Sequence, residues 1–140
     1  MADFSGFIQA QIKNPTRSLV MLDKDSATAT VLNEVLATDG AGNVEPATSA
    51  TVRSEIQGIC NQDISSGDAL TQVSAIEISE NDTWLADTEN NTDAAHNYQR
   101  MVLSDSKTVN NTGTDDPDGV VVQVEPFGAA SDKKALFKFV

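Results

Sequence analysis

The sequence holds few of the residues on which several large protein classes depend. Its single cysteine, Cys60, excludes a disulfide within the chain and is interpreted as a small buried side chain. Its single histidine, His96, lies in a polar stretch without a recognisable nucleophile motif. No serine lies in a Gly-x-Ser-x-Gly turn, and no Gly-rich phosphate loop matches. We therefore expect no enzyme activity and no cofactor.

Positive charge and long apolar runs are also scarce. Nine Lys and Arg residues face 21 Asp and Glu residues, which gives a net charge of −12. Nucleic-acid-binding surfaces are usually basic and anionic lipids repel an acidic chain, so neither nucleic acid nor a membrane is expected as a partner. The aliphatic run at residues 19–22 is too short to span a bilayer, and no secretory signal is visible. These features predict a protein made in a cytoplasm.

The charge is unevenly distributed along the chain. Residues 25–128 hold 18 acidic and three basic residues and so carry a charge of −15. Residues 1–24 hold three basic and two acidic residues, and residues 129–140 hold three basic and one acidic residue. The sequence thus predicts an acidic body with neutral or basic ends.

The apolar and polar content favours β structure. Leu, Ile, Val and Phe make up 33 of the 140 residues, above the roughly 20% below which charged chains stay disordered. Asn, Ser and Thr together make up a quarter of the chain, which is typical of short strands joined by polar turns. We predict a mainly β protein: a small single-domain β-barrel or β-sandwich over residues 17–140, with an extended N-terminal arm over residues 1–16.

Several segments are expected to form strands. They are residues 17–22, 28–38, 52–60, 70–79, 120–125 and 135–140, with Pro126 ending the fifth. Residues 28–38 also fit a helical stripe, although Thr, Val and the following Asp-Gly turn favour a strand. The stretch 80–103 stays open between loop, helix and strand, with a helical turn after Thr92 or Asp93 as one alternative.

The arm carries apolar residues among polar ones, namely Phe4, Phe7, Ile8 and Ile12. One interpretation is a terminal segment that packs on its own domain. The favoured interpretation is an arm that docks on a neighbouring subunit, because exposed phenylalanines on a free end would otherwise be a liability.

An acidic loop is the one candidate metal site. Asp115, Asp116 and Asp118 surround a proline and a glycine, and oxygen-rich loops of this kind can hold calcium. The EF-hand spacing is absent, and turn chemistry explains these residues well, so no metal is predicted.

Three blocks of the sequence resemble one family of virion proteins. They are PATSATVRSEIQGICNQDISSGDAL (46–70), TVNNTGTDDPDGVVVQV (108–124) and GAASDKKALFKFV (128–140), a little under half of the chain. In this order they resemble capsid decoration proteins of tailed bacteriophages, also called cement or head-stabilising proteins. The resemblance implies a compact β-rich body, often trimeric, that binds the outside of the expanded head and holds neighbouring capsomers together.

The resemblance also implies partners and contact residues. The partners would be the major capsid protein and further copies of this chain in a homotrimer, and the protein would lie on the capsid exterior of the virion. The arm residues that would contact the capsid are Phe4, Phe7, Ile8, Ile12, Lys13 and Arg17, with the two basic side chains facing acidic shell groups. Phe137 and Phe139 would lie either in a subunit interface or in the core.

Two alternatives remain. One is another virion component, such as a tail or head-fibre base. The other is a carbohydrate-binding β domain, for which Trp84 and Tyr98 are the only aromatic candidates.

Overall fold

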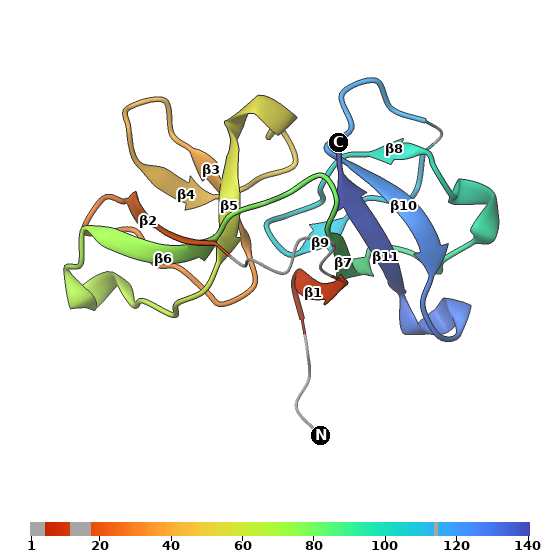
Figure 1. The fold of residues 1–140 in the computed structure, drawn as a ribbon, viewed down its shortest axis with the longest axis horizontal. Helices are drawn as coiled ribbons and strands as arrows, with labels where there is room; N and C mark the ends of the chain where they lie inside the picture. Colours follow the sequence, from red (N-terminus) through yellow and green to blue (C-terminus); the bar gives the residue numbers. More distant parts are fainter. Residues whose placement is uncertain (1–4, 12–17, 114) are drawn as a thin grey trace.

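The computed structural model describes residues 5–11, 18–113 and 115–140, and these residues form a mainly β fold, as the sequence predicts. The strands are β1 (Ile8–Gln11), β2 (Leu19–Asp23), β3 (Val35–Thr38), β4 (Val44–Pro46), β5 (Ile56–Cys60), β6 (Gln72–Ile76), β7 (Thr83–Thr88), β8 (Arg100–Met101), β9 (Thr108–Val109), β10 (Val121–Pro126) and β11 (Lys134–Phe139). They form two sheets arranged as a sandwich-like pair of lobes, and neither sheet is a closed barrel (Figure 1).

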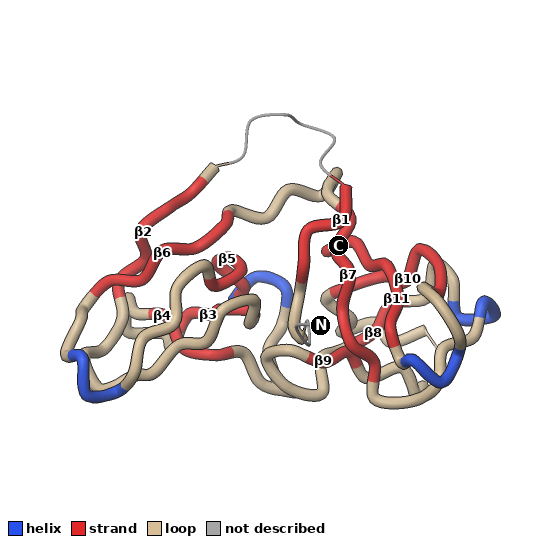
Figure 2. Tube along the Cα trace, turned by 90° about the horizontal axis from the view of Figure 1, so that it is seen from below, coloured by secondary structure: helices blue, strands red, loops and turns tan. Residues whose placement is uncertain are grey.

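Four short 3-10 helices complete the described secondary structure. They are η1 (Arg53–Glu55), η2 (Ser66–Asp68), η3 (Ala94–His96) and η4 (Ala130–Asp132). All four lie in connections between strands, and η1 lies between the two lobes (Figure 2).

The first sheet, sheet A, is built from both ends of the described chain. Its strand order is β1-β7-β11-β10-β8, with β9 pairing in parallel to β7 and every other pair antiparallel. β11 pairs with β7 on one side and with β10 on the other, so the last strand of the chain is an inner strand of this sheet.

The second sheet, sheet B, comes from one continuous stretch of the chain. Its strand order is β2-β6-β5-β3-β4, with all pairs antiparallel, which leaves β2 and β4 as edge strands. The sheet curls so far that the end of β2 meets β4 in an isolated bridge between Lys24 and Val44. The rest of this seam is open.

The larger hydrophobic core joins the two sheets. Sheet B contributes Val35, Ala37, Ile56, Ile59 and Ile76 among others, and sheet A contributes Trp84, Val121, Phe137 and Phe139. Trp84 is fully buried and its ring lies edge-on to that of Phe139, with the ring centroids 6.1 Å apart. A smaller core inside sheet B consists of Leu36, Val44, Cys60, Ile64, Val73 and Ala75.

The strand predictions fit the two ends of the chain best. Predicted strands at 120–125 and 135–140 correspond to β10 and β11, and Pro126 is the last residue of β10. The predicted strand at 28–38 is confirmed only for β3, because Asn33 has a φ of 71° and turns the chain just before it. Within 80–103 the structure forms β7, η3 and β8, and the Asp93 side chain caps η3 by accepting a hydrogen bond from the Ala95 amide.

Candidate interaction surface

Phe7, predicted to contact a capsid, is a core residue. Its side chain has no exposed area, and its ring centroid lies 5.4 Å from that of Phe139. Its amide donates a hydrogen bond of 2.8 Å to the carbonyl of Asn33, on the other lobe. The structure corrects the arm interpretation for this residue, because burying a phenylalanine in its own domain stabilises the fold more than leaving it exposed. The alternative interpretation, packing on its own domain, holds for residues 5–11.

Gly6 explains how the chain enters the core at this point. Its φ of +86° lies in the left-handed region that favours glycine. A Cβ on Gly6 would lie 2.5 Å from the backbone oxygen of Asn33, well inside the van der Waals limit. The close approach of these two backbone segments therefore requires glycine.

The remaining predicted arm residues divide into two groups. Ile8 is half-buried on β1 and is described below. Phe4, Ile12, Lys13 and Arg17 lie outside the residues that the structure describes.

Phe137 and Phe139 lie in the core and not at a surface. Their exposed fractions are 0% and 2%, respectively. The guanidinium of Arg53 lies over the Phe139 ring, with its carbon 5.9 Å from the centroid. The subunit-interface prediction is corrected for both residues, because neither side chain has enough exposed area to contact a partner.

The opposite face of sheet A, which we call the outer face, carries a row of apolar side chains. Strand register places Ile8 opposite Leu85 and Leu85 opposite Leu136, and all three are half-buried. Because side chains alternate along a strand, these residues face away from the core that holds Trp84 and Phe137.

β10 continues this row at its other side. Val122 and Val124 are half-buried on the outer face, while Val121 and Gln123 point into the protein and are fully buried. Phe127 is 50% exposed, and its amide donates to the carbonyl of Lys134, which keeps it in register with the outer face. The outer face thus consists of Ile8, Leu85, Val122, Val124, Phe127 and Leu136, together with the charged residues between them.

Sequence reasoning found only part of this face. The alternation of Val120, Val122 and Val124 was visible, yet it predicts neither that the neighbouring Gln123 is buried nor which side faces the core. Gln123 tolerates burial because its Nε2 donates at 2.9 Å to both the Asp93 carbonyl and Asn97 Oδ1. Leu85 and Leu136 gave no signal, since their strands were identified by the residues on the buried side.

Charged residues of both signs lie along the outer face. Lys134 forms an ion pair with Asp87 across β11 and β7. Lys138 lies opposite Val122, which in turn lies opposite Arg100. Sheet A therefore presents three basic side chains on a protein whose net charge is strongly negative.

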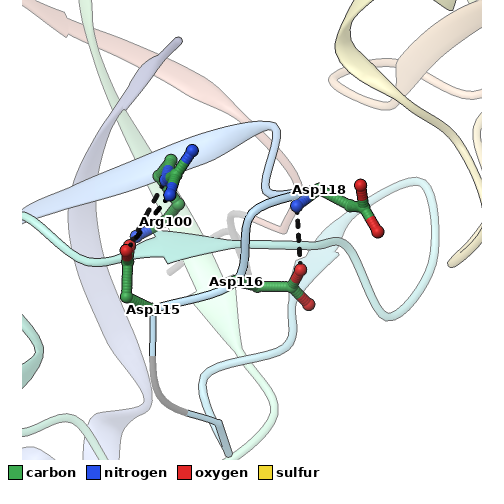
Figure 3. Close-up of polar contacts among 4 residues, drawn as sticks. All are labelled: Arg100, Asp115, Asp116 and Asp118. Atoms are coloured by element: carbon green, nitrogen blue, oxygen red, sulfur yellow. Dashed lines mark hydrogen bonds and ion pairs between the residues drawn. The ribbon is translucent and has the colours of Figure 1, made fainter.

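Arg100 and Asp115 form an ion pair beside this face, drawn in Figure 3. Arg100 Nη2 lies 3.2 Å from Asp115 Oδ2, and the Arg100 amide donates to Asp115 Oδ1 at 2.7 Å. The hydrogen bond from the Arg100 side chain lowers the pKa of Asp115 and, reciprocally, raises the pKa of Arg100. Both groups are exposed, so the pair contributes little to stability.

The acidic loop does not gather its carboxylates around one point. Asp116 Oδ1 accepts a hydrogen bond of 2.9 Å from the Asp118 amide, and the Asp118 side chain points away from Asp115 and Asp116 (Figure 3). Among the described residues, no group of three or more His, Cys, Asp or Glu side chains is placed to hold a metal ion. Turn chemistry accounts for the loop, in line with the sequence interpretation.

The two aromatic candidates for carbohydrate binding are separated by burial. Trp84 is fully buried, while Tyr98 is 77% exposed with a φ of 66°. A sugar-binding surface needs aromatic rings that a ligand can reach, and Trp84 cannot take part in one.

Comparisons with known proteins leave the family open. No protein-family model matches the chain, and a search of curated proteins found no match. Within the described ranges, no helix is long and apolar enough to cross a membrane.

Proposed function

We propose that this protein is a virion structural protein that binds the outer surface of an icosahedral phage head and stabilises the expanded capsid by bridging neighbouring capsomers. The observation that carries the proposal is the outer face of sheet A, where six apolar side chains cross four strands. Apolar rows of this extent on one sheet face are typical of protein-protein contact surfaces.

The charge distribution supports the same proposal. The basic side chains Arg100, Lys134 and Lys138 lie among the apolar residues of the outer face, whereas most of the chain is acidic. An acidic remainder that faces solvent opposes aggregation between particles, while a less acidic contact face reduces repulsion from a shell. Repeated binding at many lattice positions compensates for modest affinity at each.

The homotrimer and the location on the capsid exterior belong to the same proposal. Phe137 and Phe139 are not available for subunit contacts, so a trimer would be held by other surfaces. Ile8 keeps a role as a contact residue, now as part of sheet A instead of a separate arm.

The decisive experiment measures copy number in purified particles. Gradient-banded virions are analysed by mass spectrometry, with the major shell protein as the internal standard. A copy number comparable to that of the shell protein is the expected result. A handful of copies would indicate a tail or head-fibre base component, and absence from the particle would refute a virion role.

A binding experiment then tests the outer face. Phe127→Ser removes about half of a phenylalanine surface from the contact, roughly 100 Å² or about 2 kcal/mol, so affinity for expanded heads that lack the protein should fall about thirtyfold. Val31→Ser is the matched control, because Val31 is 43% exposed on the other lobe. Equal binding by both variants would remove the outer face from the proposal.

A further inference from the structure

The free edge of β2 is a second surface with the features of a binding site. In the part of the chain that the structure describes, β6 is the only strand that pairs along β2. Lys24 and Ser18 bond to β6 through the Lys24 amide and the Ser18 carbonyl, so the even-numbered residues between them point their backbone groups toward β6. The amides and carbonyls of Leu19, Met21 and Asp23 consequently point away from the sheet.

The side chains of this edge are unusually apolar for an exposed strand. Leu19 and Met21 are 58% and 57% exposed, and Val20 and Leu22 pack on the smaller core from the other side. Edge strands usually carry charges, prolines or bulges that prevent pairing with other chains. β2 has only Asp23, at its end, to serve that purpose.

A groove runs between this edge and the β3–β4 hairpin. It has a volume of about 330 Å³ and is lined by Met21, Leu22, Asp23, Thr38, Gly42, Asn43, Val44 and Gln57. The open seam of sheet B forms the groove, since β2 and β4 meet only at the Lys24–Val44 bridge. The space adjoins the unpaired backbone groups of β2, where an added strand would lie.

The charge around the groove is negative. Asp23 lines it, and Asp39 and Glu45 follow directly on the lining residues Thr38 and Val44. None of the lining residues is basic. Lys24 is 2% exposed and directs its ammonium to the carbonyls of Leu70 and Asp25, at 2.6 and 2.8 Å. The surroundings therefore favour a positively charged occupant and disfavour a second copy of the same acidic edge.

We propose that β2 pairs through its free edge with an extended segment of another protein, in which lysine or arginine residues alternate with apolar ones. The segment's backbone would bond to Leu19, Met21 and Asp23, and its apolar side chains would cover Leu19 and Met21. Its basic side chains would face Asp23, Asp39 and Glu45. This surface is separate from the outer face of sheet A, and the inference does not depend on the proposed function.

The test uses the full chain, labelled with ¹⁵N, and a capped peptide of alternating lysine and valine as the probe. We expect the peptide to shift the amide resonances of Leu19, Met21 and Asp23 and to slow their hydrogen exchange. The same peptide with glutamate in place of lysine should not bind. Shifts confined to other residues, or equal binding of the glutamate peptide, would overturn the inference.

Met21→Pro tests the backbone contact directly. The Met21 amide faces away from β6, so proline removes one outward donor while the β2–β6 ladder remains, and the peptide Kd should rise about fivefold. Met21→Ala keeps the amide and should show a smaller rise, and Val31→Ser should bind like the unchanged protein. Identical Kd values for Met21→Pro and the unchanged protein would refute strand pairing.

A charge variant keeps the test informative if Met21→Pro does not fold. Asp23→Asn with Glu45→Gln removes two carboxylates without touching the backbone, and the peptide should bind severalfold more weakly at low salt. Unchanged affinity would overturn the proposed basic character of the partner. Shifts of the β2 amides with protein concentration alone, without peptide, would instead assign the edge to self-association.

Discussion

Replacing Phe7 by alanine tests whether residues 5–11 belong to the folded body. The side chain is fully buried against Phe139, and a phenylalanine buries about 150–250 Å². At about 25 cal/mol per Å² its burial contributes at most about 4–6 kcal/mol, and the observed range for such truncations is about 3–5 kcal/mol. We therefore expect Phe7→Ala to lower the free energy of unfolding by about 3–5 kcal/mol.

Urea unfolding followed by tryptophan fluorescence measures this loss. Trp84 is the only tryptophan, is fully buried and contacts Phe139, so its emission reports on the core that Phe7 enters. With a slope of about 1.5 kcal/mol per M urea, the midpoint should fall by about 2–3 M. A protein of ordinary stability would then be close to unfolded in buffer.

The matched control is Phe127→Ala. Phe127 is half exposed on the outer face, and its truncation should cost about 1 kcal/mol or less. Equal midpoints for Phe7→Ala and Phe127→Ala would refute the placement of Phe7 in the core and restore the arm interpretation for this residue.

Three further predictions concern single positions. Burial raises the pKa of Glu34, against hydrogen bonds from the Val31 amide and Ser106 Oγ; the folded state then holds its proton more tightly, so stability falls as pH rises above about 4.5, and Glu34→Gln should flatten this fall in urea titrations at several pH values. Burial also raises the pKa of the Cys60 thiol, so a disulfide reagent should label it only as fast as the protein opens, and rapid labelling of the folded state would contradict the structure. Gly119→Ala should lower stability by about 1–3 kcal/mol, because its Cβ would lie 2.6 Å from the Met101 amide nitrogen, whereas Gly113→Ala, with open space around it, should change the melting temperature little.

The sequence was most informative where apolar side chains alternate in a short run. β11 is an example, because Phe137 and Phe139 on one side and lysines on the other identify a strand with one buried face. Alternation gives the two faces of a strand but not their surroundings, so it could not decide between core and interface for these residues. That choice depends on β1 and β7, which are far away in the sequence.

β7 shows why other elements were not identified. Its inward positions are Trp84, Ala86 and Thr88, with Thr83 also buried, so three of the four buried residues are small or polar. Small and hydroxyl side chains carry little apolar signal, although they pack well between close strands. The acidic residues around them made the segment look like a solvated loop.

The outer face and the β2 edge depend on strand pairing that the sequence does not specify. Ile8, Leu85 and Leu136 come from three separate parts of the chain and become neighbours only through register. The sequence did supply the acidic charge that surrounds the groove beside β2. It could not show that the backbone of Met21 faces outward, because edge position is a property of the assembled sheet.

The strand order of sheet A has a consequence for the sequence of events in folding. Sheet B needs only residues 19–60 and 72–76, so a nascent chain can pair its strands early, over short loops. Sheet A must wait for β11, which is synthesised last and lies between β7 and β10. A ribosome-bound chain that lacks residues 134–139 should therefore hold a folded sheet B beside an uncovered Trp84, and this intermediate would be the form most exposed to chaperones and proteases.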